Sequence, residues 1–189
     1  DVYKRQNRGG VISDSWIKVL VEALEEGFDI ASGLHNLLRD EPLLVAAAER
    51  FGRELHDVRV PVVDYPIANG KKRSGKRMLA VGTDCSVGKM YTCLAMDKEM
   101  RERGLKSDFR ATGQTGILIT GGGVPLDAVV ADFMAGSVEY LTPDNDEDHW
   151  DMIEGQGSLF HISYSGVTLA LVHGGQPDAL VLCLSLIHI

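Results

Sequence analysis

The sequence predicts an α/β protein built on a parallel sheet with a phosphate-binding loop. The apolar run Met78–Val81 is followed by the glycine-containing segment Gly82–Lys89 and then by a helical pattern. Further short apolar runs alternate with helical patterns as far as residue 183, which is typical of a parallel sheet covered on both faces. Strand, glycine turn, lysine and helix together form a phosphate cradle, because loop N–H groups and the helix dipole point at one place, where Lys89 adds a full charge.

Composition limits the class of protein and its partners. The chain has 189 residues, a hydrophobic content of 44%, a charged content of 24% and a formal net charge of −8. These values are ordinary for a globular protein, and the negative charge argues against a nucleic-acid or anionic-membrane partner. The three cysteines lack metal-ligand spacing, and no apolar run is long enough to span a membrane. We therefore expect a cytoplasmic protein with no metal site, a small-molecule substrate and a homo-oligomeric state.

The first part of the chain, residues 11–56, has helical patterns and little strand material. Helices are predicted over residues 13–27, 34–38 and 42–52. Pro42 and Gly52 stand where a helix typically begins and ends. An extended segment over 56–63 leads into 64–77, whose proline, glycine and five basic residues have the composition of a linker. Residues 7–70 are thus predicted to form a partial N-terminal domain with its linker, and residues 71–183 the phosphate-binding domain.

The second part of the chain alternates between strands and helices. The predicted strands cover residues 78–81, 106–111, 151–154 and 179–183. Helices are predicted over 88–103, ended by Gly104, and from Pro125 through 134, while 112–116 is predicted to be a loop. Residues 1–6 and 184–189 resemble translated sequencing-adapter read-through, so both ends are expected to be foreign and the last strand to be cut off at about Cys183.

The loop before the first of these helices departs twice from the usual P-loop pattern, G-x-x-x-x-G-K-[ST]. Thr83 stands at the first glycine position, as in the similar loop GTDTxVGKT of dethiobiotin synthetase and its relatives. The fold expected here is therefore a P-loop NTPase-like domain similar to dethiobiotin synthetase. Met90 stands at the hydroxyl position that would bind Mg²⁺, so phosphate binding is predicted, but phosphoryl transfer loses its usual metal ligand. The predicted cofactor-binding residues are Thr83, Asp84, Cys85, Ser86, Val87, Gly88, Lys89 and Met90.

A second segment, DMIEGQGS at residues 151–158, supports the same site. It resembles the D-x-x-x-E-G-x-G segment of the dethiobiotin synthetase group, whose glutamate faces the phosphate site. Ligands of open parallel sheets bind at the carboxyl ends of the strands, so Glu154 is expected near Lys89. Glu154 is predicted to hold a metal, orient Lys89 or act as a general base, and the plainer alternative is an acid that caps a neighbouring helix. Asp84 is the second candidate catalytic residue, with an ordinary turn residue as its alternative.

Other residues near the strand ends have both a functional and a structural interpretation. Gln114 and Thr115 are predicted to donate hydrogen bonds to the substrate, although an ordinary turn fits equally well. Cys85 lies near a helix N-terminus, which favours the thiolate, but a small loop filler is the plainer interpretation. The basic cluster 71–77 is interpreted as a solvated linker, or as a clamp for a further phosphate of a long nucleotide. Core or surface roles are expected for three histidines, His149, His161 and His173.

With these motifs in view, the chain resembles the D-glutamate N-acetyltransferase family. The matching segments are DIASGLH at 29–35, VGTDCSVGKMYT at 81–92, SDFRATGQTGILI at 107–119, DAVVADF at 127–133, HWDMIEGQGSLFH at 149–161 and HGGQPDALVLC at 173–183. The resemblance implies a Rossmann-like N-terminal domain, of which residues 7–70 would be a truncated, mainly helical remnant, followed by a P-loop domain. It also implies that an acetyl group passes from acetyl-CoA to the amine of D-glutamate in D-glutamate breakdown.

Met90 at the hydroxyl position agrees with the function that the resemblance implies. CoA carries phosphates that must be bound but not cleaved, which suits a P-loop without the metal hydroxyl. The expected function is an N-acetyltransferase with acetyl-CoA as co-substrate. In this mechanism loop amides and Lys89 hold the CoA phosphates, while Glu154 or Asp84 deprotonates the amine. The alternatives are an ATP/Mg-dependent ligase or carboxylase of the dethiobiotin synthetase type, and a non-catalytic nucleotide-binding module.

Overall fold

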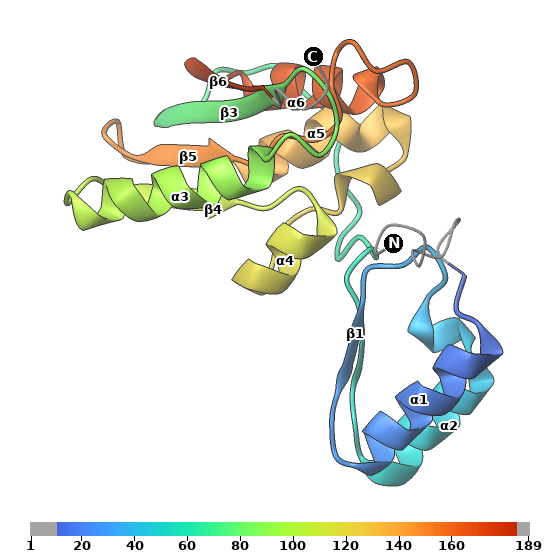
Figure 1. The fold of residues 1–189 in the computed structure, drawn as a ribbon. Helices are drawn as coiled ribbons and strands as arrows, with labels where there is room; N and C mark the ends of the chain where they lie inside the picture. The colour runs from blue at the N-terminus through green and yellow to red at the C-terminus, as the bar shows by residue number, and fades with distance from the viewer. Residues whose placement is uncertain (1–10, 185–189) are drawn as a thin grey trace. The chain divides into compact units, whose positions relative to one another are not determined.

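The computed structural model describes residues 11–184, and the chain divides into two compact units after Val60 (Figure 1). The foreign ends predicted at 1–6 and 184–189 lie outside the described residues, except for Leu184. Among the helices of residues 11–184, none has the length and apolar character needed to cross a membrane. The described elements of the first unit are α1 (Asp14–Glu25), β1 (Ile30–Ser32), η2 (Leu38–Asp40), α2 (Pro42–Phe51) and β2 (Leu55–Asp57).

The two α-helices of the first unit lie where the sequence predicts them. Ser13 is the N-cap residue of α1, in an extended conformation, and Pro42 opens α2. Gly52 ends α2 with φ of 62°, a left-handed conformation that glycine adopts without steric cost. The apolar faces of the two helices pack together, and they bury Leu24 and Leu44 completely.

The first unit has little strand material, as expected, but two predicted segments, 34–38 and 56–63, differ from the structure. The region contains a parallel pair of strands, in which Ile30 of β1 lies beside Leu55 of β2. The predicted helix over 34–38 is a bend that leads into the 3-10 turn η2. A contact distant in sequence fixes this turn, because the Asp57 carboxylate accepts the N–H of Leu38 at 2.7 Å and Nε of Arg39 at 3.0 Å. The extended segment predicted over 56–63 is strand only as far as residue 57.

The second unit contains the predicted parallel sheet, in the strand order β4-β5-β3-β6. All three neighbouring pairs are parallel, and the strands overlap the four predicted strand segments. The described elements are β3 (Lys76–Gly82), α3 (Lys89–Glu102), β4 (Ser107–Arg110), α4 (Gln114–Thr120), η3 (Leu126–Ala128), α5 (Ala131–Leu141), β5 (Trp150–Ile153), α6 (Ser165–Gly175) and β6 (Ala179–Cys183).

Helices cover both faces of this sheet, as predicted (Figure 1). Leu79 of β3 packs in one core with Val138 of α5 and Leu171 of α6. Ala80, the next residue of the strand, points to the other face and packs with Cys93 of α3. The alternation follows from the period of two along a strand, and it places β3 at the centre of both cores.

The two edge strands of the sheet differ in character. On β4 the outer positions include the charged residues Asp108 and Arg110, which form ion pairs with their neighbours. On β6, Leu180 and Leu182 are 58% and 63% exposed. The alternate residues of β6, by contrast, pack in the core beneath α3.

The basic cluster 71–77 is neither a fully solvated linker nor a phosphate clamp. Lys76 and Arg77 belong to β3, and the Arg77 side chain is 1% exposed. The Arg77 guanidinium donates to the carbonyl oxygens of Ser74 and Arg73 at 3.1 and 3.0 Å. These residues lie at the amino end of the strand, whereas the phosphate loop follows its carboxyl end, roughly 20 Å away for a strand of this length. The cluster therefore supports the sheet from its opposite end.

The segment 61–75, predicted to be mostly linker, belongs to the second unit. The N–H groups of Asn69 and Gly70 donate to the carboxylate of Glu139 on α5, at 2.9 and 2.8 Å. Arg73 donates to the carbonyl oxygen of Gly174 at 2.6 Å. The division between the units therefore falls after Val60 rather than near residue 70, because polar residues that look solvated in the sequence are bound to α5 and α6.

Three helical predictions in the second unit need correction. The helix expected from Pro125 through 134 consists of the 3-10 turn η3 and the separate helix α5. Gln114 and Thr115, predicted to lie in a loop, are the first residues of α4. Helix α6 is absent from the prediction, because its three glycines weaken the helical pattern. Tertiary packing stabilises it, since a Cβ on Gly174 would lie 2.2 Å from the carbonyl oxygen of Ala135 on α5.

Candidate phosphate-binding site

The phosphate loop occupies residues 83–88, between β3 and α3, as predicted. Gly88 is the N-cap residue of α3 and has φ of 93°, a conformation that favours glycine. Ser86 also has a positive φ, of 58°. The loop therefore turns sharply into a helix whose first N–H groups have no partner within the helix, which is the backbone arrangement that binds anions.

Lys89 is buried inside this turn. Its side chain is 6% exposed, and Nζ donates to the carbonyl oxygen of Asp84 at 2.8 Å. Burial lowers the pKa of Lys89, and attraction to Cys85, Cys183 and Asp84 offsets part of that effect. A positive charge held in a poorly hydrated turn interacts more strongly with an anion than an exposed lysine does.

The start of α3 lacks the hydroxyl that ligates Mg²⁺ in ordinary P-loops. Met90 follows Lys89 as the second residue of the helix. Thr92 carries the next aliphatic hydroxyl along α3, and its Oγ1 lies 3.5 Å from Sγ of Cys183 at the end of β6. The hydroxyl of Thr92 therefore contacts the sheet and does not replace the missing ligand.

Glu154 follows β5 and is buried, with 3% of its surface exposed. Its Oε2 accepts the N–H groups of Thr112 and Gly113, at 2.8 and 3.0 Å, just before α4 begins. Burial raises the pKa of Glu154, and hydrogen bonds from Thr112, Gly113 and Gln156 offset part of the increase. These contacts match the helix-capping alternative, because the carboxylate binds N–H groups at the amino end of α4.

Glu154 and Lys89 lie on either side of Gly155. A Cβ on Gly155 would lie 3.0 Å from Cδ of Lys89 and 1.7 Å from the carbonyl oxygen of Ala80. Within the described residues, however, no ion pair connects the two side chains. The backbone at Gly155 therefore lies close to the Lys89 side chain, while the Glu154 carboxylate binds N–H groups at the start of α4.

Gln114 and Thr115 begin α4, next to the two residues that Glu154 binds. Gln114 is half-buried and Thr115 is exposed. Because β4, β5 and β3 are neighbouring parallel strands, the segments that follow them meet at the same edge of the sheet. The phosphate loop, Glu154 and the start of α4 thus share one edge, which is the edge predicted for the site.

One group near the loop was missed by the sequence reasoning. Asp84, Cys85 and His161 each offer one potential metal ligand atom, and these atoms all lie within 4.8 Å of one another. All three residues are half-buried. The predicted absence of a metal site rested on cysteine spacing alone, which gives no signal for a histidine brought in from the segment between β5 and α6.

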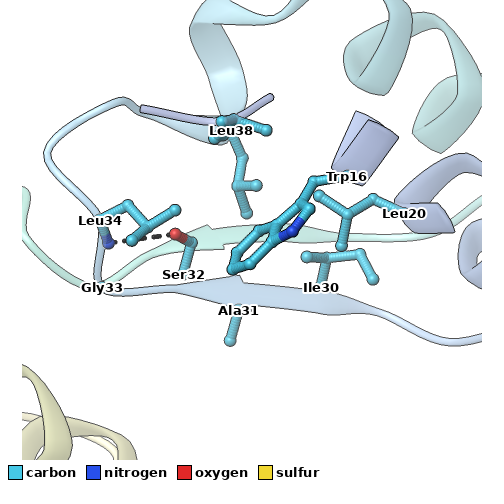
Figure 2. A pocket seen from close by; sticks show the side chains of 9 residues that line it. Trp16, Leu20, Ile30, Ala31, Ser32, Gly33, Leu34 and Leu38 are labelled. Atoms are coloured by element: carbon cyan, nitrogen blue, oxygen red, sulfur yellow. Dashed lines mark hydrogen bonds between the residues drawn. The ribbon is translucent and has the colours of Figure 1, made fainter. Parts of the chain in front are cut away.

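A separate cavity lies in the first unit (Figure 2). Its volume is about 210 Å³, and it lies among α1, β1 and the bend after β1. Trp16, Leu20 and Ile30 are among its apolar lining residues, while Ala31 points away from it. The Ser32 hydroxyl in this lining already accepts the N–H of Leu34 at 3.1 Å. Because no charged residue lines the cavity, it has no means of holding a phosphate.

The fold and the site define a P-loop protein of the parallel α/β class. Residues 66–186 match a family described as the DUF1611_C P-loop domain, a domain of unknown function, and residues 5–61 match the DUF1611_N Rossmann-like domain. The chain therefore belongs to the DUF1611 family. The resemblance drawn from the motifs and the predicted pair of domain types are confirmed.

Two curated relatives are named D-glutamate N-acetyltransferase. One, from Tritonibacter scottomollicae, is 82% identical over 177 residues, which are 94% of this chain and 53% of the relative. The other, from Pseudoalteromonas sp, is 52% identical with the same coverage. A crystal structure of a DUF1611 family protein from Anabaena variabilis superposes with a TM-score of 0.86 and 41% identity, over 94% of this chain and 52% of that one. The chain thus spans about half the length of these relatives.

Proposed function

We propose that this protein acts as an N-acetyltransferase that moves an acetyl group from acetyl-CoA to the amine of D-glutamate, in D-amino-acid catabolism. The names of the two curated relatives support the reaction class and the substrate. The observation on which the proposal depends is a phosphate loop with a buried Lys89 but with Met90 at the hydroxyl position.

The loop is suited to binding phosphate without cleaving it. CoA carries a diphosphate and a ribose phosphate, and neither is broken during acetyl transfer. The loop N–H groups, the amino end of α3 and Lys89 supply the attraction for these groups. No Mg²⁺ ligand is needed next to Lys89, because no phosphoryl group is transferred.

The chemical step is the attack of the amine on the thioester carbonyl. A carboxylate first takes a proton from the substrate ammonium, and the tetrahedral oxyanion is stabilised by N–H groups of a loop or helix end. The C–N bond then forms, the nitrogen loses its second proton, and the C–S bond breaks. The departing CoA thiolate takes up one of the two protons, and the other is released to solvent. Glu154 and Asp84 are the proposed bases. Burial raises the pKa of Glu154, which makes it the stronger base, although N–H groups of Thr112 and Gly113 and the side chain of Gln156 already bind its carboxylate.

Calorimetry on the 189-residue chain tests the binding part of this proposal. We expect CoA and acetyl-CoA to bind, and ATP·Mg to bind more weakly. Tight ATP·Mg binding without CoA binding would overturn the proposal. Turnover is tested in the longer Tritonibacter relative, with D-glutamate against L-glutamate, where a lack of acetyl transfer to D-glutamate would contradict it.

Two other functions remain candidates. The GTD and VGK residues of the loop and the E-G-x-G segment favour an ATP/Mg-dependent ligase or carboxylase of the dethiobiotin synthetase type. ADP release in the presence of substrate separates this function from acetyl transfer. A non-catalytic nucleotide-binding module would instead show binding without turnover, and its response would be lost in Lys89→Ala.

A further inference from the structure

Asp84, Cys85 and His161 bring three kinds of metal ligand together beside the phosphate loop. The carboxylate oxygen, the thiol sulfur and the imidazole nitrogen lie within 4.8 Å of one another. Asp84 and Cys85 come from the loop after β3, and His161 comes from the segment between β5 and α6. We propose that these three residues bind a divalent transition-metal ion of the zinc type, which leaves Glu154 as the base of the proposed reaction when the ion is bound.

The donor atoms determine the class of ion. Mg²⁺ and Ca²⁺ prefer oxygen ligands, whereas thiolate and imidazole ligands favour Zn²⁺ and similar ions. When the Cys85 thiol and the Asp84 carboxyl have lost their protons, the set carries two negative charges, which balance a divalent cation. Three protein ligands leave a fourth tetrahedral position open, which is the arrangement of catalytic rather than structural zinc sites.

The geometry requires only small side-chain movements. Tetrahedral ligands at zinc bond lengths lie about 3.3–3.7 Å apart, so contraction by about 1 Å completes the site. All three residues lie in loops and are half-buried, which leaves a path for the ion. Oδ1 of Asp84 accepts the N–H of Cys85 at 2.7 Å, and the His161 ring stacks on Tyr164. His161 must give up one hydrogen bond, because its Nδ1 accepts the N–H of Ser163 at 3.1 Å. Loss of the thiol proton on binding makes the affinity rise with pH.

The buried Lys89 lies in the same turn as two of the three proposed ligands. Lys89 interacts electrostatically with both Cys85 and Asp84, and its ammonium lies in the same turn. The open fourth position would then face the phosphate loop, where a phosphate oxygen can occupy it. The contact between the metal ion and a phosphate oxygen rests on the proposed function, whereas the metal site itself does not.

Titration of the 189-residue chain with Co²⁺ tests the site directly. We expect one Co²⁺ to bind with a near-ultraviolet thiolate-to-cobalt absorption band, and added Zn²⁺ to abolish the band. Cys85→Ser should remove the band, and Asp84→Asn and His161→Asn should each weaken binding by roughly tenfold or more. The matched controls are Cys183→Ser and His173→Asn. No band in the unmodified chain, or a band that persists in Cys85→Ser, would overturn the proposal.

A second measurement needs no variant. Zn²⁺ should slow the alkylation of Cys85 in the unmodified chain, as followed by peptide mass spectrometry, and an unchanged rate contradicts the site.

Addition of CoA to the Co²⁺-loaded chain tests the fourth position. A shift of the visible bands is expected, and CoA that binds by calorimetry without shifting them overturns the phosphate role alone. Failure of CoA to bind, with the cobalt band intact, rejects the proposed function and not the metal site.

Discussion

Lys89 is the residue proposed to attract the ligand of the phosphate loop, and its buried ammonium lies 2.8 Å from the Asp84 carbonyl oxygen. Lys89→Ala removes a charge-assisted hydrogen bond to a bound phosphate, worth about 2 kcal/mol, so we expect CoA affinity to fall roughly 30-fold in calorimetry. The control is Lys106→Ala, whose exposed ammonium binds Asp146 and Asp148 at 2.9 and 3.0 Å. Equal CoA affinity in Lys89→Ala and the unmodified chain would contradict this role.

Gly155 allows the chain after β5 to pass β3 at very short range. A Cβ there would lie 1.7 Å from the Ala80 carbonyl oxygen, and both groups are backbone, so neither can move aside easily. We expect Gly155→Ala to lower the free energy of unfolding by about 3 kcal/mol or more, measured by urea denaturation. Gly166→Ala is the matched control. Gly166 lies in α6, and a Cβ there would meet no other atom within 4 Å. The stability of this variant should therefore be unchanged or slightly increased.

The buried carboxyl of Glu154 makes stability depend on pH. Its pKa is raised by burial above the ordinary value of 4.5, so the folded protein holds the proton more tightly than the unfolded chain does. The resulting stabilisation is complete below pH 4.5 and is lost as pH rises through the folded-state pKa. Relative to Glu154→Gln, the unmodified chain should therefore be more stable below pH 4.5 than at neutral pH. Denaturant midpoints of both proteins at the two pH values measure this effect. If the midpoints of the two proteins differ by the same amount at both pH values, the pKa of Glu154 is not raised.

At the scale of elements, α5 holds the segment 61–75 through one carboxylate. Glu139 accepts the N–H groups of Asn69 and Gly70, and it lies 3.8 Å from Arg73. Glu139→Gln replaces one acceptor oxygen by an amide donor, so we expect a loss of about 1–3 kcal/mol in the free energy of unfolding. The exposed Glu147 supplies the control variant Glu147→Gln. Faster proteolysis of residues 61–75 in Glu139→Gln alone would localise the effect, whereas equal stability of the two variants would rule out the anchoring.

The elements that the sequence predicts well are those with local signals. Strands β3 and β6 contain apolar runs, and the phosphate loop is a continuous motif. Strands β1 and β2 are three residues long, too short to show a period. Helix α6 owes its stability to α5, which no local pattern in its glycine-containing sequence reveals.

The candidate site is predictable only in part, for the same reason. The loop around Lys89 is contiguous in sequence, so its geometry follows from its residues. The binding of Glu154 to Thr112 and Gly113 requires β4 to lie next to β5. This pairing is a property of the whole sheet and not of the local sequence. The approach of His161 to Asp84 likewise requires the three-dimensional fold.

At the scale of the whole molecule, a net charge of −8 surrounds a site proposed for an anionic ligand. Attraction must therefore come from the local field of Lys89 and the loop N–H groups. The cytoplasmic location and the homo-oligomeric state stay predictions.

A thermal-shift screen of the chain tests whether this attraction binds a ligand. The compounds are CoA, acetyl-CoA, ATP·Mg, D-glutamate and L-glutamate. Saturating CoA, at 100 times its dissociation constant, should add about 2.7 kcal/mol to the free energy of unfolding and raise the melting temperature. The increase should shrink as salt rises, because salt screens the exposed part of the attraction. A shift with ATP·Mg and none with CoA would favour the ligase alternative.

The character of β6 has a practical consequence for handling the protein. Within residues 11–184, this strand forms one edge of the sheet and presents Leu180 and Leu182 outward. An exposed apolar edge can recruit a strand from another molecule. Preparations for crystallisation or spectroscopy should therefore be kept dilute and checked by light scattering, so that self-association is not mistaken for ligand-dependent assembly.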